Sequence, residues 1–223
     1  SPDGSLIALG SFDAPHKICL YDSRSGEVIR VIDNMSLSYK FAFTADNQIL
    51  LSAECGAGVP LIDVSTGAVI RSLPESSAKG SCDSDWVALS PDGTLIATGG
   101  SDGVAEIWEF STGELLRTFV GHTDILWSAT FSPDGRNLLT TSADGTARLW
   151  DISTGVELRR FSGHTASVWG GAFSPDGRRV ATTSSDDVVK IWLTDLDELK
   201  SAVCDSLPRD LSVTERKSYG ITD

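Results

Sequence analysis

The sequence predicts an all-β fold, a β-propeller built from four-stranded antiparallel blades. A turn of the type Ser-Pro-Asp-Gly starts at positions 1, 90, 132 and 174, with a degenerate copy at 44, so the intervals are 43, 46, 42 and 42 residues. Each full interval holds four short runs of strand-forming residues, separated by Gly, Asp and Ser turns. A four-strand unit repeated with this period is typical of propeller blades.

The elements of one unit follow a fixed order. The opening turn suits its residues because Pro presets φ at its second position and Gly accepts an unusual φ at its fourth. A first run follows, as in 95–99 and 138–142, then an Asp-Gly turn, then an alternating run that ends in Trp108, Trp150 or Trp192. Ser-Thr-Gly at 65–67, 111–113 and 153–155 leads to a fourth run such as 114–119. The units therefore predict antiparallel strands joined by tight turns.

The repeats divide residues 1–193 into five units, approximately 1–43, 44–89, 90–131, 132–173 and 174–193. In this division the first blade lacks its innermost strand and the last lacks its outermost strand. We expect three complete blades between two partial ones. Because open blade faces need a cover, we predict that the chain is the C-terminal part of a larger, seven-bladed ring.

Residues 194–223 predict a short helical tail. Leu196, Leu199 and Val203 have helical spacing, and Pro208 interrupts that pattern. Ser212-Val-Thr-Glu215 has the form of a capping box at the start of a second helix. Two interpretations of this tail are open and can both hold. The tail can be a segment with a sequence of its own type, or it can be a solvated pair of helices that covers the edge of the last blade.

Composition narrows the classes of partner. The formal net charge of −13 disfavours a nucleic-acid phosphate backbone as a ligand. No apolar run is long enough to span a membrane. The four cysteines have no metal-ligand spacing, which predicts free, buried thiols in a reducing compartment such as the cytoplasm.

The repeat motifs resemble those of the WD40 family over residues 1 to about 193. Gly121-His122 and Gly163-His164 precede inner strands, and Trp150-Asp151 ends a third strand. The motifs erode in the first two repeats, where Tyr21 and Ile62 replace Trp. The tail resembles the ending of bacterial WD40 proteins that carry a signalling module upstream, except that Arg216 stands where that ending has Trp.

This resemblance implies a buried hydrogen-bond network in each of two blades. The two sets of matching residues are His122, Thr140, Asp144 and Trp150, and His164, Thr182, Asp186 and Trp192. The alternative is catalysis by a His-Asp pair with a hydroxyl nucleophile, which requires an open cleft. Because the same set occurs twice, a structural role is the favoured interpretation.

The resemblance also places one residue of each inner strand on the narrow top face around the channel. These candidate binding residues are Tyr39, Asp85, Trp127 and Trp169, and Ser101, Ala143 and Ser185 are expected to share that face. Aromatic side chains are enriched in interaction hot spots. The alternative is that Trp127 and Trp169 pack between blades as core.

Together these features predict a non-catalytic scaffold or sensor module that binds a protein or peptide. We expect no cofactor, no metal, and neither nucleic acid, membrane nor small molecule as partner. The alternative is a propeller enzyme, a hydrolase or quinoprotein, with its active site in the central channel. The Ser-Thr-Gly-Glu stretch is similar to a quinoprotein docking motif, but Phe119 and Phe161 stand where that motif ends in Trp.

Overall fold

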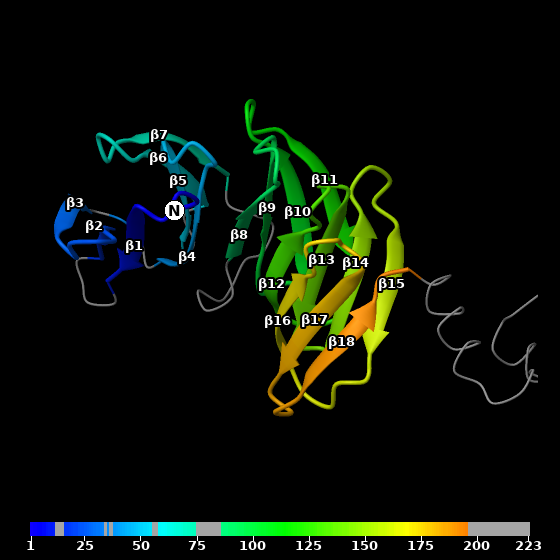
Figure 1. Cartoon of the computed structure of the whole chain (residues 1–223). Helices are drawn as coiled ribbons and strands as arrows, with labels where there is room; N and C mark the ends of the chain where they lie inside the picture. Colours follow the sequence, from blue (N-terminus) through cyan, green and yellow to red (C-terminus); the bar gives the residue numbers. More distant parts are fainter. Residues whose placement is uncertain (12–15, 34, 36–37, 55–57, 75–85, 196–223) are drawn as a thin grey trace, which may run out of the picture.

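A computed structural model gives the fold of the chain (Figure 1). The structure describes residues 1–11, 16–33, 35, 38–54, 58–74 and 86–195, with only the backbone for Ser38 and Tyr39. Within these residues the chain forms 18 β-strands and no helix. The all-β prediction is confirmed for this part, whereas the predicted helical tail lies outside the described residues from position 196 onward.

The strands form five antiparallel sheets, called blades 1 to 5 in chain order. Blade 1 contains β1 (Leu6–Gly10), β2 (Ile18–Asp22) and β3 (Val28–Ile32). Blade 2 contains β4 (Ser38–Phe43), β5 (Ile49–Glu54), β6 (Val59–Asp63) and β7 (Val69–Leu73). Blade 3 contains β8 (Trp86–Leu89), β9 (Leu95–Gly99), β10 (Val104–Glu109) and β11 (Leu115–Val120). Blade 4 contains β12 (Leu126–Phe131), β13 (Asn137–Ser142), β14 (Thr146–Asp151) and β15 (Glu157–Ser162). Blade 5 contains β16 (Val168–Phe173), β17 (Arg179–Ser184) and β18 (Val189–Leu193).

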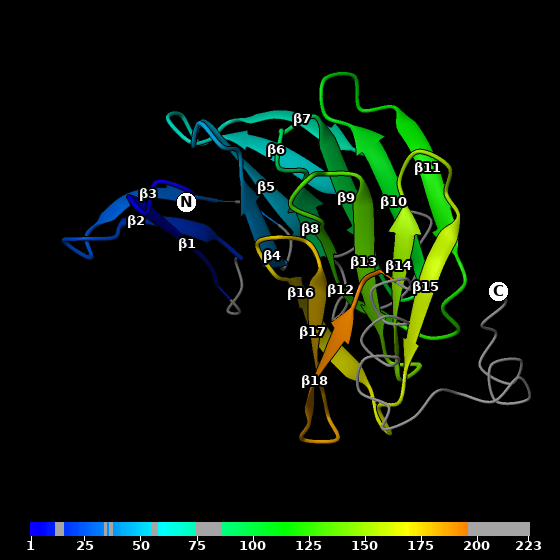
Figure 2. The same cartoon turned by 45° about the vertical axis from the view of Figure 1, so that its right-hand side comes forward.

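Within each blade, every strand pairs with the next strand along the chain. Blades 2, 3 and 4 have four strands, and blades 1 and 5 have three in the described residues, as the sequence predicted. The first strands of successive blades contact one another: β4 with β8, β8 with β12, and β12 with β16. Figure 2 shows these strands toward the inside of the arrangement and β7, β11 and β15 toward the outside. The fold is therefore that of a propeller.

Apolar side chains of neighbouring blades form the core between the sheets. Between blades 3 and 4, Ile107 and Phe119 cluster with Leu138 and Trp150, all almost fully buried. The rings of Phe119 and Trp150 lie 5.6 Å apart between centroids, a favourable tilted contact across the two blades. The Trp that ends each third strand thus packs on the outer strand of the preceding blade.

The Ser-Pro-Asp-Gly turns are closed by their own side chains. At 90–93 the Ser90 hydroxyl donates to Asp92 at 2.6 Å, and the Gly93 N–H donates to the Ser90 carbonyl at 2.9 Å. The fourth position has a φ of 71° at Gly93 and 58° at Asn47 of the degenerate turn. Asn tolerates this left-handed conformation better than most residues, so the turn survives its altered sequence.

An arginine on the outer strand joins each blade to the next, in what we call the blade joint. The guanidinium groups donate to carbonyls in the Ser-Thr-Gly region of the following blade: Arg30 to Ser65 and Thr66, Arg71 to Phe110 and Ser111, and Arg117 to Ser153 and Thr154. The Arg117–Ser153 distance is 2.7 Å. A Cβ on Gly155 would lie 3.0 Å from the Cδ of Arg117, and the φ of Gly155 is 77°. The left-handed φ and the close approach of Arg117 thus both favour glycine at this position.

Candidate functional site

The predicted network of blade 4 has all four side chains in hydrogen-bond contact. His122 contacts the Asp144 carboxylate through Nδ1 and the Thr140 hydroxyl through Nε2, each at 2.8 Å. The Trp150 indole N–H donates to the same Thr140 oxygen at 2.9 Å. One direction of donation satisfies every group, from Trp150 to Thr140, from Thr140 to His122, and from His122 to Asp144. The network ties β14 and β13 to the segment before β12.

The second predicted network repeats this geometry in blade 5. His164 contacts Asp186 at 2.9 Å and Thr182 at 2.8 Å, and the Trp192 indole N–H donates to Thr182 at 2.8 Å. Trp192 is less buried than Trp150, because no further described blade covers this face, whereas the side chains of His164 and His122 are each 1% exposed. The structure thus brings together all eight residues that the sequence grouped into two sets.

Hydrogen bonds to the two aspartates keep them ionised. Burial alone would raise the pKa of Asp144, but hydrogen bonds from His122 and Thr146 outweigh it and hold the pKa well below its usual value. For Asp186, the backbone N–H of Thr165 is the largest influence, and with His164 it lowers the pKa to about 2. Each carboxylate is therefore a fixed acceptor that orients its histidine.

Asp144, His122 and Thr140 have the connectivity of a catalytic triad, with a hydroxyl on one histidine nitrogen and a carboxylate on the other. A nucleophile must, however, be reachable by its substrate. Thr140 is 0% exposed, and its oxygen also accepts the Trp150 N–H. The arrangement has no access for a substrate and holds the blade together instead.

Blade 3 contains a further pair of this kind that was not singled out from the sequence. The Trp108 indole N–H donates to the Thr98 hydroxyl at 2.8 Å, and both side chains are buried. The repeat gave a sufficient signal, because Thr98 and Trp108 lie 42 residues before Thr140 and Trp150.

Three of the candidate top-face residues lie in the described part of the chain. Tyr39 lies in β4, Trp127 in β12 and Trp169 in β16, each as the second residue of an inner strand. Strand pairing shifts register at each of them, so each is the extra residue of a β-bulge. A bulge turns a side chain away from the regular pleat and is common beside functional sites. Asp85 lies outside the described residues.

Trp127 and Trp169 form an aromatic pair between blades 4 and 5. Their ring centroids lie 4.6 Å apart with 37° between the planes. Trp127 is half-buried, whereas Trp169 is 50% exposed. The Trp169 indole N–H donates to the Ser185 hydroxyl at 2.6 Å. The pair thus presents an aromatic surface at the end of the inner strands.

Lys40 adds a charge that the sequence did not reveal. It is the exposed residue that follows Tyr39 in β4, and its ammonium donates to the Trp127 carbonyl at 3.4 Å. This contact reaches from blade 2 to blade 4, past blade 3. The pairing depends on how the blades curve around the channel, so no local pattern could have predicted it.

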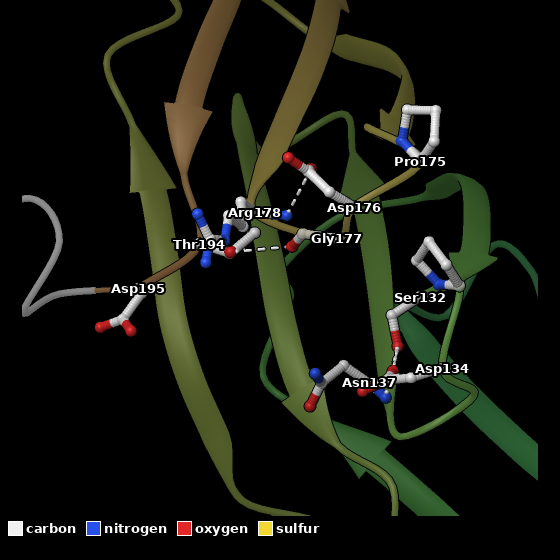
Figure 3. A pocket seen from close by; sticks show the side chains of 10 residues that line it. Ser132, Asp134, Asn137, Pro175, Asp176, Gly177, Arg178, Thr194 and Asp195 are labelled. Carbon is white, nitrogen blue, oxygen red and sulfur yellow. Dashed lines mark hydrogen bonds between the residues drawn. The ribbon is translucent and has the colours of Figure 1, made fainter.

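The opposite end of blades 4 and 5 has a pocket of about 760 Å³ between two Ser-Pro-Asp-Gly turns (Figure 3). Asp134 and Asp176 line it, but their carboxylates close their own turns by accepting from Ser132 at 2.5 Å and from the Arg178 N–H at 3.0 Å. None of the sequence-predicted site residues lines this pocket. It therefore lies apart from the aromatic pair.

No group of three or more His, Cys, Asp or Glu side chains in the described part of the chain is placed to hold a metal ion. No helix in that part of the chain is long and apolar enough to cross a membrane. Cys19 is a free thiol but is only partly buried, so the expectation of a buried thiol is wrong for this residue. Cys19 lies in β2 of blade 1, and because no described sheet precedes blade 1, that face of the blade has no described cover.

Comparisons with known proteins match the repeat units. The family model described as WD domain, G-beta repeat matches residues 76–109, 113–151 and 155–192. The chain is 30% identical over 126 residues to mitochondrial division protein 1 of Saccharomyces cerevisiae, a match that covers 56% of this chain and 14% of the relative.

Two more relatives are shorter matches. Nuclear distribution protein nudF of Aspergillus niger is 31% identical over 99 residues, covering 44% of this chain and 21% of the relative. An uncharacterized WD repeat-containing protein of Nostoc sp. is 56% identical over 36 residues, covering 16% of this chain and 2% of the relative. The chain thus spans about a fifth or less of the length of each of these three relatives.

Proposed function

Because the chain belongs to the WD40 repeat family, we propose that it is a non-catalytic interaction module that binds a protein or peptide through the end of the blades that carries Trp127 and Trp169. The observation that carries this proposal is the half-exposed Trp169 stacked on Trp127 at two matching β-bulges. A large aromatic side chain left in water costs free energy that a partner can recover by covering it.

Several features support a scaffold over an enzyme. The hydroxyl, imidazole and carboxylate groups that could carry chemistry are used within the two buried networks. The relatives are named for mitochondrial division and nuclear distribution, not for a reaction. WD40 relatives with such names are consistent with a role in bringing proteins together.

The same proposal includes the wider setting that the sequence suggested. We propose a seven-bladed ring, and the need for a further blade is supported by Val189 and Ile191 of β18, which are 64% and 70% exposed although their counterparts Ala147 and Leu149 in β14 are buried against blade 5. A bacterial protein is supported by the Nostoc relative; a signalling role is proposed from the resemblance of the tail alone. A cytoplasmic location is supported by the free thiol of Cys19, and the net charge of −13 disfavours nucleic acid and anionic membrane surfaces as partners. The absence of a small-molecule partner is proposed with them.

Selection from a random peptide library tests the proposed binding surface. Peptides selected on the wild-type chain should lose most of their affinity for Trp169→Ala, because an aromatic hot spot contributes about 2 kcal/mol or more, roughly thirtyfold in Kd. Val120→Ala is the matched control, since Val120 is an exposed apolar residue on an outer strand. Peptides that bind Trp169→Ala as well as they bind the wild type would overturn the proposal.

A further inference from the structure

The aromatic pair presents its ring faces to a ligand but has no free hydrogen-bond donor. The Trp169 N–H is already bound to Ser185 at 2.6 Å. The Trp127 N–H is buried and has no partner among the described residues. What remains exposed is the π face of Trp169, backed by a second ring at 4.6 Å. Such a surface attracts either apolar groups or cations, because the face of an indole ring carries negative potential.

Each of these two blades has an exposed aspartate close in the sequence to the aromatic pair or to the serine that it binds. Asp124 is exposed three residues before Trp127, and its Oδ1 accepts the Ile125 N–H at 2.8 Å. Asp187 is exposed in the same turn as Ser185, and its side chain makes no hydrogen bond to any described residue. Both lie on a chain with a net charge of −13. The local and overall charges therefore favour a cationic ligand.

From this combination we infer that the partner presents a lysine or arginine side chain, which lies on the exposed face of Trp169 and is attracted by the carboxylates of Asp124 and Asp187. The inference rests on the proposed function and adds the chemical class of the bound segment. A cation held over an indole and near carboxylates gains from both attractions at once. The ligand is thus a basic peptide segment.

Lys40 provides an opposing charge that makes the inference sharper. Its ammonium lies against the Trp127 carbonyl at 3.4 Å, on the rim of the same surface. It repels a cationic ligand and attracts an anionic one. Removal of this charge must therefore tighten the binding of a basic peptide, whereas removal of Asp124 or Asp187 must weaken it.

Short glycine-serine peptides that carry lysine, arginine, norleucine or glutamate at the same positions are the probes, titrated by calorimetry against the whole chain. The lysine and arginine peptides should bind most tightly, and added salt should weaken them. Trp169→Phe should retain most of the affinity, and Trp169→Leu should lose about tenfold, because leucine keeps the apolar surface but has no π face.

Charge variants separate the cationic class from simple apolar binding. Asp124→Asn and Asp187→Asn should each weaken the lysine peptide severalfold, and Lys40→Gln should tighten it severalfold. Asn keeps the acceptor for Ile125 and tolerates the left-handed φ of 62° at position 187, so both variants preserve the backbone. Near-ultraviolet circular dichroism checks that each variant keeps its tertiary packing.

Three outcomes would overturn the inference. These are equal binding of the norleucine peptide, stronger binding of the glutamate peptide, and no binding of the lysine or arginine peptides. In each of them the proposed function stands if library peptides still depend on Trp169. If the library peptides show no dependence on Trp169, both the inference and the proposed function fail.

Discussion

At the scale of single residues, one buried hydroxyl serves two neighbours in each network. Thr140 accepts from Trp150 and contacts His122, and all three side chains are less than 8% exposed. Thr182 makes the same two contacts in blade 5, but its partner Trp192 is only partly buried, whereas the His164 side chain is as buried as that of His122. The two sites therefore have the same chemistry and different access to water.

This difference predicts unequal costs for the same substitution. Thr140→Val removes the hydroxyl at nearly constant shape and leaves two buried groups unpaired, which should lower the free energy of unfolding by about 1–3 kcal/mol. Thr182→Val should cost less, because the partly buried Trp192 N–H can then bind water. Urea denaturation of both variants measures the difference. Equal costs would show that burial of the partners does not decide the penalty.

At the scale of elements, the contacts that form the strands and turns of a blade join residues close in the sequence, whereas the blade joints connect residues far apart in the sequence. A Ser-Pro-Asp-Gly turn is closed within four residues. The blade joint instead connects Arg117 in β11 to a turn more than 35 residues later. The glycine of that turn therefore has a role that only the assembled blades reveal.

Two glycine substitutions isolate the energy of this joint. Gly93→Ala and Gly155→Ala both force alanine into a left-handed conformation, which costs about 1–2 kcal/mol each. Only Gly155→Ala also meets an arginine, since a Cβ at Gly93 has no atom within 4 Å. Gly155→Ala should lower the midpoint of chemical unfolding further than Gly93→Ala.

Arg117→Ala supplies the control for this comparison. In that background the clash disappears, so the two glycine variants should become similar in stability. A difference that persists without Arg117 would mean that the joint does not explain the glycine at position 155.

At the scale of the whole molecule, the aspartates link stability to pH. Hydrogen bonds hold the pKa of Asp186 at about 2, against 3.8 for an ordinary aspartate, and the pKa values of the turn aspartates Asp92, Asp134 and Asp176 are also lowered, chiefly by serine hydroxyls. Protons then bind the unfolded chain more tightly than the folded chain. The stability from these groups is fully present above about pH 4 and is lost as the pH falls toward 2.

Thermal unfolding across this range checks the sign. The midpoint temperature should fall as the pH is lowered from 5 toward 3, and Asp186→Asn should reduce the slope, because one of the linked groups is gone. His122 and His164 keep their other contacts in this variant. A slope unchanged by Asp186→Asn would exclude this aspartate as a source of the pH dependence.

The sequence predicted the features that repeat and missed those that depend on assembly. The period placed the four strands of each complete blade. The resemblance to the WD40 family grouped His122 with Thr140, Asp144 and Trp150, and each of these contacts lies within one unit or at its border. Lys40 and the arginines of the blade joints were missed, since their partners lie in other blades. The sequence also could not decide whether Trp169 is exposed, because a tryptophan on an inner strand can be buried between blades or turned toward solvent at a bulge.

The blade joint has a consequence for how such a chain can grow. Each unit supplies an arginine to the blade after it and a carbonyl pair to the blade before it, as Arg71 and Ser111 and then Arg117 and Ser153 illustrate. A tandem duplication of one unit of about 42 residues would therefore copy both halves of the joint together. The new blade would find a matching donor and acceptor on its two sides at once, so the length of the array can change by gene duplication without new contacts having to evolve.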